Sequence, residues 1–174
     1  NCTLEEITFF IENTIKKKIK YDLNNPMNGG IPFPPMIGVN NVIAHQTLKD
    51  NSKKYKIKNN DIIRIDYGVH TNGYIIDSAF TYSLNNKYND FFNISKKITR
   101  KAVSLCNVDK SIIDFGEEMN EYIHSKQFEY EGKIYNCKII KNLNGHNIKR
   151  FHVHGGQKLP FIKNNISGKI KNNV

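Results

Sequence analysis

The stretch RIDYGVHTNGYIIDSAF, residues 64–80, places two carboxylates inside runs of β-branched and aromatic residues. Asp66 and Asp77 lie on either side of HTNG, which is typical of a tight turn. If the turn has two loop residues, either Thr71-Asn72 or Asn72-Gly73, both aspartates lie on one face of a hairpin, about 5–8 Å apart. A three-residue loop would place them on opposite faces.

Two carboxylates that close repel each other, and a divalent metal ion or a pair of ions between them removes the repulsion. The alternative is that both aspartates face solvent. Apolar neighbours in YIIDSAF favour the first interpretation, because a carboxylate among apolar side chains needs a partner. The hairpin is therefore a candidate metal site.

Histidines add possible nitrogen ligands. His45 lies in IAHQT, His146 lies in NLNGHNI, and His152 and His154 share one face of a predicted strand in FHVHGG. Carboxylate and imidazole ligands without thiolate favour Mn, Fe, Co or Zn. Taken alone, these residues support two hypotheses: a dinuclear hydrolase, or histidines with surface and structural roles only.

Several elements must position these side chains. TLEE at Thr3–Glu6 predicts a capping box and a first helix to about Lys20, and alternation predicts strands over 62–70 and 74–84. The remaining predicted elements are helices within 88–106 and 111–126, a hairpin over 128–140 that turns at Glu131-Gly132, the loop NLNGH, and a strand over 148–154. This mixture predicts an α+β fold.

The composition limits the classes of function. The chain has 174 residues and a formal net charge of +10, carried mostly by scattered lysines. That charge permits contact with ribosomes or RNA, but without a basic stripe we expect a solvated surface and no specific DNA binding. Three cysteines without CxxC spacing predict free thiols in a reducing compartment, so we expect a cytoplasmic protein. No apolar run is long enough for a membrane span, so we expect no membrane contact.

Four motifs, in this order, resemble the type 2 methionine aminopeptidases: FP…VNNVIAH, IRIDYGVHTNGYIIDSAF, KIIKNLNGHNI and FHVHGGQKLPFIK. Paired aspartates alone would indicate only the wider pita-bread superfamily, and NLNGHNI followed by HVHGG points to type 2. The resemblance implies the pita-bread α+β fold. It also implies removal of N-terminal methionine from nascent polypeptides, with ribosome association as a further expectation.

The resemblance also implies residue roles and two divalent metal ions, Co, Mn, Fe or Zn. Asp66 would bind one ion, Asp77 would bridge both, and His146 would bind the other. His45 would contact the scissile amide or the substrate's amino-terminal methionine, and His154 would help to stabilise the tetrahedral intermediate. Phe33 and Val153 would line the methionine pocket, and His154 and His45 would also contact substrate. His152 matches no role in the family and is expected to be structural.

The ligand set expected for the family is incomplete in these residues. The family adds two glutamates downstream of HVHGG, so residues 1–174 are expected to be a partial catalytic domain, without the C-terminal half and the type 2 helical insertion. We therefore expect these 174 residues alone to be weakly active or inactive. The alternatives are a non-catalytic pita-bread paralogue that binds RNA or ribosomes, which the charge would suit, and a proline-directed relative of the aminopeptidase P or prolidase type.

Overall fold

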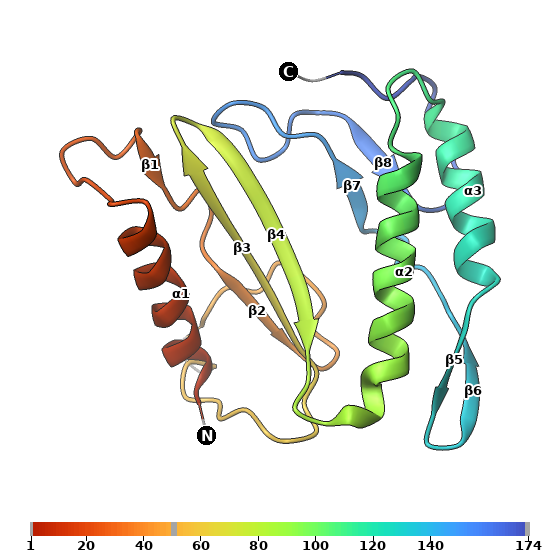
Figure 1. Ribbon diagram of the computed structural model, residues 1–174, viewed down its shortest axis with the longest axis horizontal. Helices are drawn as coiled ribbons and strands as arrows, with labels where there is room; N and C mark the ends of the chain where they lie inside the picture. Colours follow the sequence, from red (N-terminus) through yellow and green to blue (C-terminus); the bar gives the residue numbers. More distant parts are fainter. Residues whose placement is uncertain (1, 50–51, 173–174) are drawn as a thin grey trace. The chain divides into compact units, whose positions relative to one another are not determined.

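The computed structural model describes residues 2–49 and 52–172 and divides the chain into two compact units. The first unit contains the residues up to Asn86 together with Lys149–Val153, and the second contains Lys87–Ile148 together with the residues from His154 onward. The chain therefore passes from the second unit to the first and back within a short stretch near residue 150. Figure 1 shows helices and strands in each unit, which confirms the α+β class.

Helix α1 (Leu4–Lys18) begins at the predicted capping box. The backbone N–H of Glu6 donates to Thr3 Oγ1 at 3.2 Å, and the Thr3 N–H donates to Glu6 Oε2 at 2.8 Å. Both bonds satisfy N–H groups that a helix start leaves without intrahelical partners. Leu4 packs with Ile37 and Ile63 in a buried cluster, so the helix covers one face of the sheet of the first unit.

The sheet of the first unit is centred on β3 (Ile63–Thr71). One side of β3 pairs with β4 (Tyr74–Tyr82), and the other side pairs with β1 (Gly29–Gly30) near one end and β2 (Met36–Val39) near the other. All three pairings are antiparallel. The predicted hairpin is therefore confirmed, with strand ends within two residues of the expected ones.

A two-residue loop, Asn72-Gly73, connects β3 and β4, because Thr71 pairs with Tyr74. Both loop residues have positive φ angles, 50° for Asn72 and 81° for Gly73. Positive φ at both positions is characteristic of the type I′ turn, whose twist matches that of the flanking strands. The turn thus fixes the register of the hairpin.

The second unit combines two helices with one hairpin and a separate pair of antiparallel strands. Helix α2 (Asn89–Leu105) follows the 3-10 turn η1 (Asn86–Tyr88) and packs against α3 (Ile112–His124), as Figure 1 shows. The core of the second unit is formed by Ala102, Phe115, Met119, Ile123 and Cys137. Apolar periodicity predicted both helices, and the hairpin of β5 (Gln127–Tyr130) and β6 (Lys133–Asn136) turns at Glu131-Gly132 as expected.

The last predicted loop and strand are wrong. Part of NLNGH forms β7 (Asn144–His146), which pairs with β8 (Lys158–Pro160), whereas 148–154 is not a strand. Residues 149–152 instead form a tight turn in which the Lys149 and His152 N–H groups donate to each other's carbonyls at 3.0 and 2.8 Å. Phe151 in this turn has φ of 60°, which an extended strand does not allow.

Among the described residues, no helix combines the length and the apolar character that crossing a membrane would require.

Asp61 is the one buried charged side chain of the described core, with 5% of its surface exposed. Its carboxylate accepts hydrogen bonds from the Asn40 amide at 2.9 Å, the Tyr55 hydroxyl at 2.9 Å and the Lys58 N–H at 2.8 Å. Asn40 in turn accepts from the Ile62 N–H at 3.0 Å, next to the start of β3. Asp61 therefore ties the connection after β2 to the strand that carries Asp66.

Replacing Asp61 with alanine should lower the free energy of unfolding by about 3 kcal/mol, because three donors lose a charged acceptor inside the protein. Urea unfolding followed by circular dichroism measures the change. Asn59→Ala, at an exposed position of the same connection, is the matched control and should change the value by less than about 0.5 kcal/mol. Equal effects of the two substitutions would contradict the assigned role.

The same carboxylate should make stability depend on pH. Burial acts to raise the pKa of Asp61, but the hydrogen bonds from Lys58, Asn40 and Tyr55 together hold this pKa below its ordinary value. A depressed folded-state pKa stabilises the fold above the unfolded pKa of about 3.9 and loses that effect as the pH falls through the folded pKa. The stability difference between wild type and Asp61→Asn should therefore shrink from pH 7 to about pH 3, and a constant difference would refute this.

Candidate metal centre

The two candidate aspartates lie on the same face of the hairpin. Asp66 pairs with Ala79 and Asp77 pairs with Gly68, so the aspartates are diagonal neighbours across β3 and β4. Diagonal neighbours of this kind are typically about 7–8 Å apart. The conditional prediction for a two-residue loop is thereby met. The Asp66 Oδ1 atom is buried, and Asp77 is half-buried.

This face is opposite to the one that helix α1 covers. The cluster under α1 contains Ile63 and Ile65 of β3, and successive side chains of a strand point to opposite faces. Asp66 and Gly68 therefore point away from the helix. The sheet thus has one apolar face, which packs against α1, and one face that carries the carboxylates.

Phe33, predicted to line a methionine pocket, contacts the carboxylate face. A Cβ atom on Gly68 would lie 2.6 Å from Phe33 Cε1 and 2.7 Å from Pro32 Cγ. Gly68 is directly opposite Asp77 in the ladder. An aromatic ring thus packs on the sheet beside the carboxylate pair, where only glycine leaves room for it.

His45 belongs to the same unit and is exposed, with a left-handed backbone at φ of 61°. The residue after it, Gln46, accepts a hydrogen bond from the Ile37 N–H at 3.3 Å. This bond holds the chain beside β2, whose Met36 pairs with Asp66. His45 is therefore anchored through its neighbour next to the strand that flanks Asp66.

The second unit supplies a pair of imidazoles. His146 ends β7, and the ring centroids of His146 and His154 are 4.4 Å apart with an interplanar angle of 61°. The two histidines thus come together although eight positions separate them in the sequence. Val153, the other predicted pocket residue, is half-buried and belongs to the first unit.

Asn147 closes the loop between the two histidines, and sequence reasoning missed it. Its carbonyl accepts from the Gly155 N–H at 2.7 Å, and its side-chain Oδ1 accepts from the Gln157 N–H at 2.8 Å. A Cβ atom on Gly155 would lie 2.6 Å from Asn147 Nδ2, so the close approach requires glycine. In the sequence, the asparagine directly after His146 and the glycine directly after His154 were the signals that could have predicted this contact.

His152, which is expected to be structural, makes one side-chain hydrogen-bond contact within its own turn. Its Nδ1 atom lies 3.0 Å from the Arg150 carbonyl oxygen, inside the tight turn of residues 149–152. The side chain is exposed. The predicted common strand face with His154 does not exist, because neither residue lies in a strand.

The side chains present suit a divalent metal ion by their chemistry. Two carboxylates on one face, one of them with a buried oxygen, provide negative charge, and the histidine pair provides neutral nitrogen ligands. The carboxylates belong to the first unit and the imidazoles to the second. Within the described residues, no group of three such side chains lies close enough to hold an ion.

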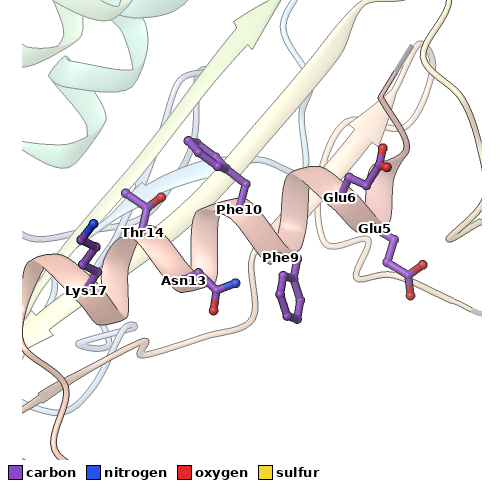
Figure 2. A pocket seen from close by; sticks show the side chains of 7 residues that line it. All are labelled: Glu5, Glu6, Phe9, Phe10, Asn13, Thr14 and Lys17. Carbon is purple, nitrogen blue, oxygen red and sulfur yellow. The ribbon is translucent and has the colours of Figure 1, made fainter.

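A hollow on helix α1 is a different kind of surface. Phe9, Phe10, Asn13 and Lys17 line it together with Glu5, Glu6 and Thr14, and Figure 2 shows all of these side chains projecting from this one helix. Glu6 is engaged in the capping box, where the hydrogen bond from the Thr3 N–H lowers its pKa. The hollow contains neither the candidate aspartates nor a histidine, so it is not the candidate centre.

Known structures identify the fold. The crystal structure of methionine aminopeptidase from Rickettsia prowazekii matches 99% of this chain and 65% of its own chain, with a TM-score of 0.73 and 18% sequence identity. The pita-bread fold expected from the resemblance is thereby confirmed, with a sheet that presents its paired aspartates on one face.

The sequence pattern of metallopeptidase family M24 matches residues 3–174, and the chain belongs to this family. "Methionine aminopeptidase 2-1" of Aspergillus clavatus is 34% identical over 173 residues, which are 98% of this chain and 36% of that protein. "Methionine aminopeptidase 2" of Komagataella phaffii is 36% identical over 159 residues, 91% of this chain and 35% of that protein. The resemblance to type 2 enzymes is thus confirmed, and the chain spans about a third of the length of these relatives.

Substituting Gly68 with alanine should displace Phe33, because the new methyl group would lie 2.6 Å from a ring carbon. We expect a loss of about 1–3 kcal/mol in unfolding free energy, as for other overpacking substitutions. The ¹⁹F NMR signal of a fluorinated phenylalanine at position 33 should shift as well.

Gly29→Ala is the matched control, since its Cβ would meet only ordinary contacts of 3.4 Å and longer. The packing of Phe33 on Gly68 would be refuted if both glycine substitutions had the same effect on stability and on the ¹⁹F signal.

Proposed function

We propose that this protein takes part in the removal of N-terminal methionine from nascent polypeptides, as a metal-dependent aminopeptidase. The observation that carries the proposal is one face of the first unit's sheet, where Asp66 and Asp77 are diagonal neighbours and Phe33 packs on Gly68, which is directly opposite Asp77. Membership of a metallopeptidase family and similarity to proteins named methionine aminopeptidase 2 support it.

We propose two divalent ions as the cofactor, held by Asp66, Asp77 and His146. When bound, such ions supply Lewis-acid chemistry and lower the pKa of water to near neutral. The aspartates provide negative charge that would otherwise repel across the hairpin, and His146 adds a nitrogen ligand. Carboxylate and imidazole ligands favour Co, Mn, Fe or Zn as the bound metal.

The other residues would bind and orient the peptide. His154, whose ring contacts His146, would donate a hydrogen bond to the oxygen of the scissile carbonyl as negative charge develops there. His45 would contact the substrate near its first peptide bond. Phe33 and Val153 would form the apolar pocket that selects the methionine side chain by fit.

Three further expectations accompany the proposal. Three metal-binding residues are fewer than the five that the resemblance implies, so these 174 residues alone are expected to be weakly active or inactive. Ribosome association is expected from the function and from the net charge of +10. A cytoplasmic location would follow from action on nascent chains.

Asp77→Asn should remove a bridging ligand and lower kcat/KM for release of methionine from Met-Ala peptides by more than about 100-fold, the upper limit for outer-shell residues of metal sites. Asp66→Asn should act alike. Metal content, measured by atomic emission after loading with Co²⁺ or Mn²⁺, should fall in parallel. The protein should be assayed as it occurs in the cell, purified without truncation.

Asp109→Asn is the matched control, because Asp109 is exposed and its left-handed backbone, with φ of 68°, accommodates asparagine equally well. Full turnover and normal metal content in Asp77→Asn would refute the assigned role. A wild-type protein that binds no divalent ion but retains RNA with a steep salt dependence would favour the non-catalytic alternative. Preference for X-Pro peptides would favour the proline-directed one.

A further inference from the structure

Helix α1 presents two adjacent phenylalanines to solvent. Phe9 and Phe10 are 66% and 71% exposed, whereas Leu4 and Ile15 of the same helix are buried. The phenylalanines line the hollow described above, and Figure 2 shows both rings projecting from the helix. Apolar side chains rimmed by polar ones are characteristic of an interaction surface. We call this surface the α1 face, which consists of Glu5, Glu6, Phe9, Phe10, Asn13, Thr14 and Lys17.

Charged side chains lie at the two ends of the α1 face. Glu5 and Glu6 belong to the first turn of the helix, and Lys17 belongs to the last. The Glu6 carboxylate is held there by the capping box, in which it accepts from the Thr3 N–H at 2.8 Å. Negative charge at one end of the face and positive charge at the other therefore flank the two rings.

This order of charges makes the α1 face complementary to a second copy of itself. A two-fold axis that crosses the helix midway between Glu6 and Lys17 reverses the direction of the second helix. Glu6 of each copy then lies opposite Lys17 of the other, at both ends of the pair. A parallel pair would instead place Glu6 beside Glu6 and Lys17 beside Lys17, where like charges repel.

The same axis places the rings at the centre of the pair. Phe10 and Asn13 lie at equal distances on either side of it, and so do Phe9 and Thr14. Each pair of phenylalanines therefore lies opposite the shorter side chains of Asn13 and Thr14 of the second copy, which leave space for the rings. An apolar centre with a polar rim is the usual composition of a protein interface.

The geometry of helix packing permits all these contacts at once. Glu6 and Lys17 are eleven positions apart, which is about 16 Å along an α-helix. Helices that cross at about 20° stay in contact over such a length, whereas a crossing near about 50° separates their ends. The charged pairs therefore require the shallow, antiparallel crossing.

We propose that the α1 face is the contact surface of a symmetric homodimer, in which α1 of one copy packs antiparallel against α1 of a second copy. Phe9 and Phe10 form the apolar centre, and Glu6 and Lys17 of the two copies pair at each end. One pair of helices buries less surface than a standard stable interface, so we expect a weak dimer with a Kd in the micromolar range. The inference goes beyond the proposed function and does not depend on it, because the α1 face contains none of the candidate metal or substrate residues.

Sedimentation equilibrium of the untruncated protein, from about 1 to about 500 µM, should show a reversible equilibrium between monomer and dimer. The salt concentration should be about 0.15 M, where charges elsewhere on the two copies are largely screened despite the net charge of +10. Phe9→Ala and Phe10→Ala should each raise the Kd of the dimer about 10-fold or more, since the two-fold axis doubles every loss. Leu23→Ala, at a residue of the same unit that is 82% exposed, is the matched control and should leave the Kd unchanged.

Charge substitutions test the direction of the helices. Lys17→Glu should raise the Kd, because two glutamates would then face each other at each end of the pair. Glu6→Gln in the same chain should restore part of the affinity, since glutamine preserves the capping box and removes the repulsion. Lys18→Glu, the same change at the next position but outside the α1 face, is the matched control for effects on the helix itself.

A carbodiimide joins a carboxylate directly to a lysine amine in contact with it, so it should cross-link Glu6 of one copy to Lys17 of the other. The same two residues of one helix are about 16 Å apart, too far for such a link within one chain. Mass spectrometry of the cross-linked dimer identifies the joined peptides.

A protein that stays monomeric throughout this concentration range overturns the proposal, whatever else binds the α1 face. A dimer that Phe9→Ala and Phe10→Ala leave intact, or that Leu23→Ala weakens as much, overturns it as well. A dimer without the link between Glu6 and Lys17 overturns the antiparallel arrangement.

Discussion

The register of one hairpin determines whether the candidate centre exists. Side chains alternate between the faces of a strand, so a slip by one residue between β3 and β4 would move one aspartate to the face that α1 covers. The Asn72-Gly73 turn prevents this, because positive φ at both positions permits a two-residue loop. Buried Ile63 on the opposite face adds a second restraint, since the same slip would expose it.

His146 ends the strand β7 and pairs with Lys158, whereas His154 is held by a different kind of structure. No ladder positions His154; the chain around it is ordered by the Asn147 side chain and by the close approach of Gly155 to it. Such loops lack the cooperative pairing of a sheet and rely on individual hydrogen bonds of about 1 kcal/mol each. The carboxylates of the first unit are thus a rigid pair, whereas the position of His154 in the second unit depends on few contacts.

Local patterns were sufficient for much of this fold. Thr3 and Glu6 marked the start of α1, apolar periodicity marked α2 and α3, and NG between alternating runs marked the hairpin. The alternating letters of IKRFHVH also suggested a strand, and there the prediction failed. Its structure is decided by Asn147 and by the contact of Arg150 with Asn72, 78 positions earlier, which no local pattern contains.

The residue types of the site were predictable, but its supporting contacts were not. Paired aspartates and clustered histidines suggested a metal, and the order of the motifs suggested the family, which the comparisons confirm. The packing of Phe33 on Gly68 depends on tertiary approach. Gly68 lies between Asp66 and Asp77 in the sequence, but a glycine there does not by itself predict that an aromatic ring packs on it. Glycine occurs in strands for several other reasons, such as bulges and bends.

Because the Arg150 side chain and the Phe151 N–H donate to the main-chain carbonyls of Asn72 and Gly73, these hydrogen bonds do not depend on the identity of the side chain at position 72. Position 72 should therefore tolerate substitution by any residue that accepts a left-handed backbone, such as aspartate. Position 73 is different, since both its φ of 81° and the Phe151 ring packed on it exclude a side chain. Among homologues that keep this loop, we expect variation at one residue and invariance at its neighbour.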